Sequence, residues 1–302
     1  MTGAGEKPSP SPASPKPSRA SVPSGRNVCG PDIPAKVISG DMVGVVVACD
    51  DFSGSKPRLG RTYILDDNIK GSLDGRGSRS RSNAKLDRRA GVMRLIANGH
   101  VGAGINFKPP AGREGVVDGM FSVRVRYIVG DDLQSAVGYN AAIGGWPASL
   151  DWSKGENTAL EAHVNIAGDE FFGQTNIHSH VDTRAQPSKS ASKQFARTDL
   201  ASGKWVTVTW IVKGDEIRIL ANGKPILRNG DNAEVWKSNR FGIVDPKGEY
   251  LYMQVDPDSA GERSPAKGYL EMEVTSVAMY ALNNNNKASR NDAVSVTQLK
   301  LG

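Results

Sequence analysis

The sequence has few of the residues that build metal centres, and it has no long apolar segment. Its 302 residues include only 2 cysteines and 4 histidines, too few for a zinc or iron–sulfur centre with several cysteine or histidine ligands. It also has no run of about 20 apolar residues, the length that a membrane-spanning helix needs. We therefore expect no membrane span, no cysteine-rich metal module and no small disulfide-stabilised protein.

Sustained helical periodicity is missing too, whereas strand-like alternation recurs. Glycine (34) and proline (17) make up about one residue in six, as in turn-rich β proteins. Residues 121–127 alternate apolar and charged side chains, residues 204–212 alternate and are β-branched, and residues 269–280 predict a long final strand. Residues 216–227 predict a hairpin that turns at Asn222-Gly223. The pattern predicts an all-β sandwich or jelly roll of two antiparallel sheets.

The chain is expected to divide into an arm, one domain and a tail. Residues 1–26 contain six prolines and six serines, and such a segment buries too little apolar surface to fold, so we expect a disordered linker. Residues 27–282 form the predicted domain, and residues 283–302 a polar C-terminal tail. A monomer is expected.

Two features of the N-terminal region bear on where the protein acts. The arm lacks the basic and apolar regions of a secretory signal, so either a signal has been removed or export does not use that route. Pro/Ser-rich spacers often tether extracellular domains, which favours a secreted or cell-surface protein. Cys29 and Cys49 lie twenty residues apart at the edge of the predicted domain, which favours a disulfide. Two free, buried thiols are the alternative.

Basic residues exceed acidic residues by a small margin. The 38 lysines and arginines against 32 aspartates and glutamates give a net charge of +6, which favours anionic partners without indicating nucleic acid. Six of the basic residues fall within residues 76–89 with no aromatic residue between them. A stacking surface for single-stranded nucleic acid is therefore not expected. A solvated basic loop is the simplest interpretation, and contact with an anionic polymer or cell surface is the alternative.

The segment from Glu156 through Thr158 to Glu161 carries the most specific chemistry. Retaining cleavage of a glycosidic bond uses two carboxyl groups about 5–5.5 Å apart, one as nucleophile and one as proton donor. On a regular strand Glu156 and Thr158 share a face and Glu161 lies on the other, so a β-bulge is expected to bring Glu161 to their side. Like charges at that distance push their pKa values apart, as an acid and a nucleophile require. Taken alone, the spacing fits two solvated surface carboxylates better.

In context, the sequence resembles glycoside hydrolase family 16, the concanavalin-like jelly-roll enzymes that cleave β-glucans. The resemblance covers about residues 49–282 and keeps the family's order of motifs. It rests on the Asp-Asp-Phe-x-Gly element at 50–54, Trp146-Pro147, the glutamate segment at 156–161, the Trp-rich strand and hairpin at 204–224, and Tyr280-Ala281 at the end of the final strand. It implies a concanavalin-like fold and an endo-β-glucanase-like glycosidase acting on a β-linked polysaccharide.

The resemblance also implies roles for the glutamates. Glu156 matches the family's nucleophile and Glu161 its general acid/base. Thr158 stands where the family has an aspartate that is hydrogen-bonded to the nucleophile. A hydroxyl can orient a carboxylate, but it cannot share its charge or tune the titration of the pair, so this departure affects turnover. A non-catalytic lectin-like protein and a structural surface or virion protein on the same fold are the alternatives.

Aromatic and polar residues near the glutamates are candidates for substrate binding. Trp152 is expected to stack on a sugar ring, and Trp146 to form a cleft wall or part of the core. The resemblance implies that His178 and Gln254 line the cleft. A solvated or structural role is the alternative for both.

No metal or cofactor is expected at the remaining candidates. His178 and His180 would share a strand face, but no third ligand accompanies them. Asp131, Asp132 and Asp245 are interpreted as solvated turn residues, with a structural Ca²⁺ away from the cleft as the alternative. A retaining glycosidase needs no redox cofactor.

Overall fold

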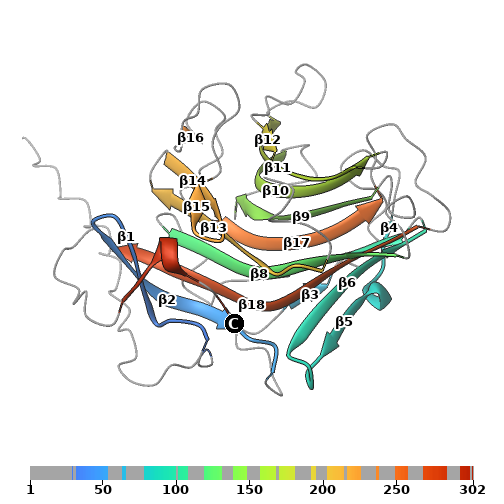
Figure 1. Ribbon diagram of the computed structural model, residues 1–302, viewed down its shortest axis with the longest axis horizontal. Helices are drawn as coiled ribbons and strands as arrows, with labels where there is room; N and C mark the ends of the chain where they lie inside the picture. The colour runs from blue at the N-terminus through green and yellow to red at the C-terminus, as the bar shows by residue number, and fades with distance from the viewer. Residues whose placement is uncertain are drawn as a thin grey trace, which may run out of the picture.

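Two antiparallel β-sheets, built from strands in which alternate residues are apolar, make up the computed structural model (Figure 1). The structure describes residues 29, 32–53, 63–65, 78–99, 101–107, 119–130, 139–147, 157–167, 170–180, 192–194, 203–213, 216–225, 236–237, 249–257, 268–283, 293–299 and 301. The predicted arm, residues 1–26, lies outside this part of the chain. Among the described residues, no helix is long and apolar enough to cross a membrane.

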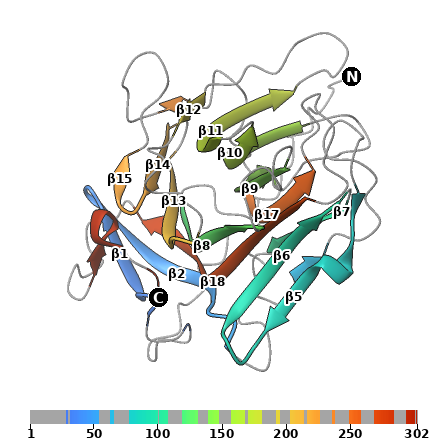
Figure 2. The same cartoon turned by 45° about the vertical axis from the view of Figure 1, so that its right-hand side comes forward.

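The first sheet is named the β18 sheet after its central strand. Its strands are β1 (Lys36–Ser39), β2 (Met42–Asp50), β5 (Ala84–Asp87), β6 (Val92–Asn98), β8 (Gly119–Val129), β13 (Val206–Lys213), β14 (Glu216–Ala221), β15 (Lys224–Pro225), β16 (Trp236–Lys237), β18 (Tyr269–Asn283) and β19 (Val294–Ser295). β18 pairs with β8 along one side and with β6 and then β2 along the other. β13 and β14 extend the sheet beyond β8. On the other side of β18, β1 pairs with β2 and β5 pairs with β6, so β1 and β5 lie near opposite ends of β18 (Figure 2).

The second sheet is named the β10 sheet. Its strands are β3 (Tyr63–Leu65), β7 (Val101–Phe107), β9 (Tyr139–Pro147), β10 (Asn157–Ala167), β11 (Glu170–His180), β12 (Ser192–Gln194) and β17 (Glu249–Pro257). Their order across the sheet is β3–β7–β17–β9–β10–β11–β12, and every pairing is antiparallel. The short strand β4 (Ser78–Arg79) pairs in parallel with the start of β7. The architecture confirms the predicted concanavalin-like sandwich.

The main core lies between the two sheets. Ile105, Ile143 and Met253 of the β10 sheet and Val125 and Trp210 of the β18 sheet belong to one buried cluster, each at most 1% exposed. Burial of each such side chain stabilises the fold by roughly 1.5–3 kcal/mol. These residues therefore fix which face of each strand points inward.

A second buried cluster covers the opposite face of the β18 sheet. Val37 near the start of the described chain and Leu299 and Leu301 near its end pack there against Ile211 and Tyr280. β19 pairs in parallel with β1, and the 3₁₀ helix η5 (Val296–Gln298) follows it directly. The described part of residues 283–302 therefore belongs to the fold, which extends past the domain boundary predicted at residue 282.

The outer face of the β18 sheet also carries an ion-pair row. Glu273 pairs across the strands with Arg94 on one side and Arg126 on the other. Its side chain is 2% exposed, lies 3.3 Å from Arg94 Nη2, and accepts a hydrogen bond from Arg126 Nε. The Arg126 guanidinium lies 4.7 Å from the ring centroid of Trp205. A buried carboxylate needs such compensation, so Glu273 depends on both arginines.

Local sequence signals account for several elements. In β8 the odd positions from Phe121 to Tyr127 are at most 2% exposed, which confirms the predicted alternation. Asn222 and Gly223 have φ values of 48° and 77° and close the tight turn between Ala221 and Lys224, which confirms the predicted hairpin. A Cβ on Gly223 would also collide with the backbone carbonyl of Thr297. The glycine therefore allows the C-terminal segment to pack directly against the turn.

The interpretation of residues 76–89 as a loop is wrong for part of this segment. The 3₁₀ helix η1 (Arg81–Asn83) leads into β5, and β5 pairs with β6. Ala84 and Leu86 pack against the main core. These two alternate apolar residues therefore make residues 84–87 a strand, although most charged residues of the segment are basic. Lys85 is exposed.

The predicted disulfide is confirmed. Cys29 is bonded to Cys49 at the end of β2, with a Cα–Cα distance of 5.5 Å. Both cysteines are at most 3% exposed and belong to the second cluster. The bond therefore ties the segment before β1 to the β18 sheet.

Replacing both Cys29 and Cys49 by alanine should lower the free energy of unfolding by about 3 kcal/mol, because the bond closes a loop of 20 residues in the unfolded chain. Urea unfolding of the double variant measures this loss. Wild type with dithiothreitol should behave in the same way, and equal stability with and without the bond would contradict the prediction.

Tyr280 offers a second test of the fold. It is 0% exposed, and its hydroxyl has no hydrogen-bond partner among the described residues. Burial raises its pKa above the ordinary value. The neutral phenol is therefore favoured in the folded state, and its contribution is complete below about pH 10 and is lost as the pH rises above that value.

The variant Tyr280→Phe should keep or raise stability at pH 8, by up to about 1 kcal/mol, because it removes an unpaired buried hydroxyl. Its stability should also fall less steeply than that of wild type above pH 10. Urea unfolding at pH 8 and at alkaline pH checks both effects. A loss of stability at pH 8 would show that the hydroxyl is paired in solution.

Candidate functional site

The β10 sheet turns one face toward the core and leaves the other on the outside of the sandwich. Ile143 of β9 and Met253 and Val255 of β17 are 0% exposed and belong to the main core. Strand residues alternate between faces, so the positions on either side of these residues lie on the opposite face. We call this the outer face of the β10 sheet.

Cross-strand register brings two rows of positions together on this outer face. In the first row, Glu161 of β10 lies opposite Gly144 of β9 and Asn176 of β11, and Gly144 lies opposite Tyr252 of β17. In the second row, His163 of β10 lies opposite Ala142 of β9 and Gln174 of β11. Ala142 in turn lies opposite Gln254. The rows are neighbours because their members are two residues apart on each strand.

Three of the predicted substrate-binding residues fall on this face. Trp146 lies two positions beyond Gly144 on β9, opposite Tyr250. His178 lies two positions beyond Asn176 on β11. Gln254 follows Met253 and is only 5% exposed. Sheet register thus brings Trp146, His178 and Gln254 to the face that carries Glu161, although they lie far apart in sequence.

Thr158 occupies the other face. β10 pairs residue for residue with β11, from Asn157 opposite His180 to Ala167 opposite Glu170, so Thr158 and Glu161 alternate to opposite faces. The β-bulge expected between residues 156 and 161 is absent from residues 157–161, because every residue there has its own partner on β11. Glu156 and Trp152 lie outside the described residues, as do Asp131, Asp132 and Asp245.

Three further positions of this face, His163, Gln174 and Asn176, are not among the site residues predicted from the sequence. Each lies at an even spacing from a predicted site residue, His163 from Glu161 and the other two from His178. The alternation of strand residues therefore indicates which residues share a face with a predicted site residue. Only the register between strands shows which of them lie next to it. No group of three or more His, Cys, Asp or Glu that would hold a metal occurs among the residues that the structure describes.

The outer-face positions differ in residue size. On β9 the residues are Gly144 and Ala142, which have little or no side chain, whereas the facing positions of β10 and β17 are Glu161, His163 and Gln254.

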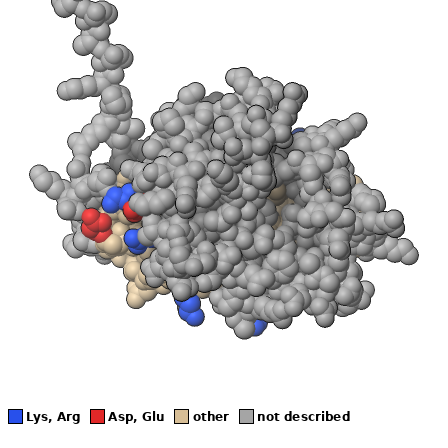
Figure 3. Space-filling model, turned by 90° about the horizontal axis from the view of Figure 1, so that it is seen from above, with Lys and Arg blue, Asp and Glu red and all other residues tan. Residues whose placement is uncertain are grey.

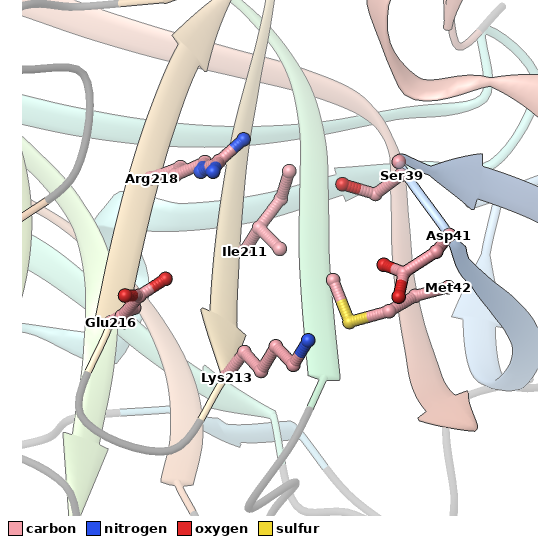
Figure 4. A pocket seen from close by; sticks show the side chains of 8 residues that line it. Ser39, Asp41, Met42, Ile211, Lys213, Glu216 and Arg218 are labelled. Carbon is pink, nitrogen blue, oxygen red and sulfur yellow. The ribbon is translucent and has the colours of Figure 1, made fainter. Parts of the chain in front are cut away.

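A separate small pocket lies on the β18 sheet (Figure 4). Its volume is about 110 Å³. Ile211 and Met42, which are 4% and 8% exposed, form an apolar part of its wall. Lys213 and Arg218 lie opposite Asp41 across it, so its rim carries both signs of charge.

The described surface shows the same mixture of charges. In the space-filling view, basic and acidic side chains lie next to one another (Figure 3). Burial lowers the pKa of Arg124, and nearby Asp32 opposes this shift. On this face the visible described residues form no large patch of one sign.

Comparison with known proteins identifies the fold. No family model matches the chain, and no curated protein matches it. Solved structures do. The endo-β-1,3-glucanase from Pyrococcus furiosus has a TM-score of 0.59 and 10% identity, covering 83% of this chain and 99% of its own. The non-specific endo-β-1,3(4)-glucanase SCLam from family GH16 has a TM-score of 0.55 and 16% identity, covering 82% and 96%.

The chain has the fold of the family 16 glycoside hydrolases. The laminarinase from Rhodothermus marinus agrees, with a TM-score of 0.56, 15% identity and coverage of 80% of this chain and 99% of its own. The family 16 fold suggested by the sequence motifs is confirmed at this level. At identities of 10–16% the likeness concerns the fold, and the chemistry of this chain rests on its own residues.

Proposed function

We propose that the protein binds a β-linked polysaccharide, of the β-glucan class, along the outer face of the β10 sheet and hydrolyses it. The observation that carries the proposal is the register of the β10 sheet, which places Glu161 between Gly144 of β9 and Asn176 of β11, with Tyr252 of β17 opposite Gly144. The fold shared with β-glucanases supports the ligand class. No redox cofactor takes part.

The proposed reaction is a double displacement. Glu156 attacks the anomeric carbon while Glu161 gives its proton to the leaving oxygen, and water then hydrolyses the glycosyl-enzyme with Glu161 as base. This mechanism needs the two carboxyl groups about 5–5.5 Å apart. Because β10 is regular from Asn157 onward, Glu156 meets that condition only if the chain departs from strand alternation directly before Asn157.

The backbone directly before Asn157 distinguishes two arrangements of Glu156. If alternation continues back to Glu156, Thr158 shares the face of Glu156 and can orient it, but both then lie on the face opposite Glu161. If the chain departs from alternation before Asn157, Glu156 joins Glu161 and Thr158 has no part in the site. The first arrangement favours a second candidate function, a lectin-like protein that binds the same polysaccharide without cleaving it.

The remaining assignments follow from this proposal. Trp152 and Trp146 would stack on sugar rings, and His178 and Gln254 would hydrogen-bond to hydroxyl groups. Secretion or attachment to a cell surface is proposed because the polysaccharide is extracellular and the Cys29–Cys49 disulfide favours an oxidising compartment. The protein is proposed to act as a monomer.

The proposal predicts release of reducing sugar from β-1,3- or mixed-linkage β-glucan, with retention of the anomeric configuration in the product. Glu161→Gln and Glu156→Gln should each lower kcat on the order of 100-fold or more, because each removes a group that acts in the transition state. Glu170→Gln at the start of β11, nine residues from Glu161 in sequence, is the matched control and should retain activity.

Each other result selects an alternative. Binding of β-glucan without release of sugar, unchanged in Glu156→Gln, supports the lectin-like function. Failure to bind any member of a glycan panel contradicts both and favours a structural surface or virion protein.

Position 144 tests the location of the groove. Gly144→Val should keep the strand, because β-branched residues suit β-sheets, but should weaken β-glucan binding about tenfold or more, because it adds a branched side chain at the position opposite Glu161. Asn140→Val lies on the same face of the same strand, four residues away, and should leave binding unchanged. Affinity electrophoresis in β-glucan gels measures both variants. Equal binding by Gly144→Val and wild type would exclude this groove.

A further inference from the structure

A cluster of basic residues lies on the outer face of the β18 sheet, the face that points away from the β10 sheet. Lys85 of β5 lies directly opposite Arg94 of β6. Glu273 of β18 lies between Arg94 and Arg126 of β8. Arg124 shares the face of Arg126, because it lies two residues away on the same strand. We call Lys85, Arg94, Arg124 and Arg126 the basic cluster, which extends across β5, β6, β18 and β8 (Figure 2).

The acidic partners of this cluster are buried, whereas its basic residues reach solvent. The side chains of Glu271 and Glu273 are 6% and 2% exposed, and those of Arg94 and Arg126 are 39% and 34% exposed. Lys85 is exposed. The two carboxylates therefore hold the guanidinium groups from below, and the surface of the cluster carries mainly positive charge.

The arginine side chains are already held in position. Arg126 donates a hydrogen bond from Nε to Glu273, and its guanidinium packs on the ring of Trp205. The Arg124 guanidinium lies 5.5 Å from the centroid of the same ring. Side chains that are ordered before binding lose less entropy when a ligand binds, so the cluster is suited to hold an anion.

Pairing within the sheet gives no reason for the cation at position 85. Like charges directly opposite each other destabilise a sheet, and Lys85 lies opposite Arg94. The apolar residues on either side of Lys85 already anchor β5 to the main core. Lys85 belongs to the basic segment 76–89, and in the fold this segment adds positive charge to the arginines of β6 and β8.

The positive charges are spaced apart, which bears on the kind of polymer that fits. Asp32 is exposed and lies near Arg124, and Asp87 lies two residues beyond Lys85 on β5. Double-stranded DNA carries one charge per about 1.7 Å of its axis, and single-stranded nucleic acid binds through a series of open aromatic rings. A polymer with at most one charge per sugar ring matches this spacing better.

We propose that the basic cluster binds an acidic polysaccharide, one that carries carboxylate groups on its sugar rings. A planar guanidinium pairs with a carboxylate through two parallel hydrogen bonds, and arginines predominate in the cluster. Three strand spacings separate Lys85 from Arg126, about 14 Å in all, so the cluster can contact more than one carboxylate of a chain. The choice of a polysaccharide rests on the proposed function, with which the protein is anchored through one sheet and acts on β-glucan with the other.

Binding of polygalacturonate tests the proposal. Each of its sugar rings carries a carboxylate, and the methyl-esterified polymer is the matched control because it has the same chain without the charge. We expect wild type to bind polygalacturonate in about 50 mM salt and to lose affinity as the salt concentration rises, since ions screen the attraction. The esterified polymer should bind at least about tenfold more weakly. Isothermal titration calorimetry measures each affinity.

The double variant Lys85→Gln/Arg124→Gln removes two cations of the cluster and leaves both partners of the buried Glu273 in place. It should weaken polygalacturonate binding about tenfold or more. Lys213→Gln/Arg218→Gln is the matched control, because it removes the same charge at the small pocket on the same sheet, and it should bind as wild type does. Lys85→Gln alone changes only an exposed side chain, so it should keep the fold and weaken binding about threefold.

Several results would overturn the proposal. These are no binding of polygalacturonate by wild type, equal binding of the esterified polymer, and an equal loss of affinity in the two double variants, which would reflect overall charge. Tighter binding of single-stranded DNA or of phosphatidylserine vesicles, weakened by Lys85→Gln, would assign the cluster to a different anionic partner.

The candidate site on the β10 sheet is tested separately. Glu161→Gln should bind polygalacturonate as wild type does, because position 161 lies on the other sheet. A protein that binds polygalacturonate through the cluster but neither binds nor cleaves β-glucan contradicts only the proposed function. A protein that cleaves β-glucan without binding polygalacturonate contradicts only the proposal for the basic cluster.

Discussion

Burial of alternate apolar side chains between the two sheets fixes almost everything else about the molecule. Ile143, Met253 and Val255 point inward. Because strand residues alternate between faces, the positions between them must lie on the outer face. A slip of one residue would bury Glu161 and expose the core. The packing of the core therefore determines which residues lie on the face that carries the candidate site.

The β18 sheet supports this arrangement from the other side. Its outer face is closed at one end by the second cluster, which joins both ends of the described chain and the Cys29–Cys49 bond. At the other end the buried Glu273 is held between Arg94 and Arg126. The β18 sheet is therefore the supporting layer, and the β10 sheet has small and polar residues at the positions of its outer face.

Sequence reasoning succeeded wherever a signal is local. The turn at Asn222-Gly223 needs residues that accept positive φ. The alternation of residues 121–127 reflects one buried face of a strand. Both features can be predicted from residues adjacent in the sequence. It failed for residues 84–87, because composition masked the two apolar positions that pair β5 with the core. The prediction of a β-bulge was wrong for residues 157–161, because the position of a bulge depends on the pairing with neighbouring strands.

The sequence by itself determined the all-β class, the sandwich and the segment that holds Glu161, and it favoured the disulfide. Each depends on residue type and spacing within a short stretch of chain. Only the tertiary structure decided that Glu161 shares a face with His163 and not with Thr158, and that Gln254, about 90 residues further along, lies in the neighbouring row. The physical reason is that register arises from pairing between strands distant in sequence, which local patterns cannot specify.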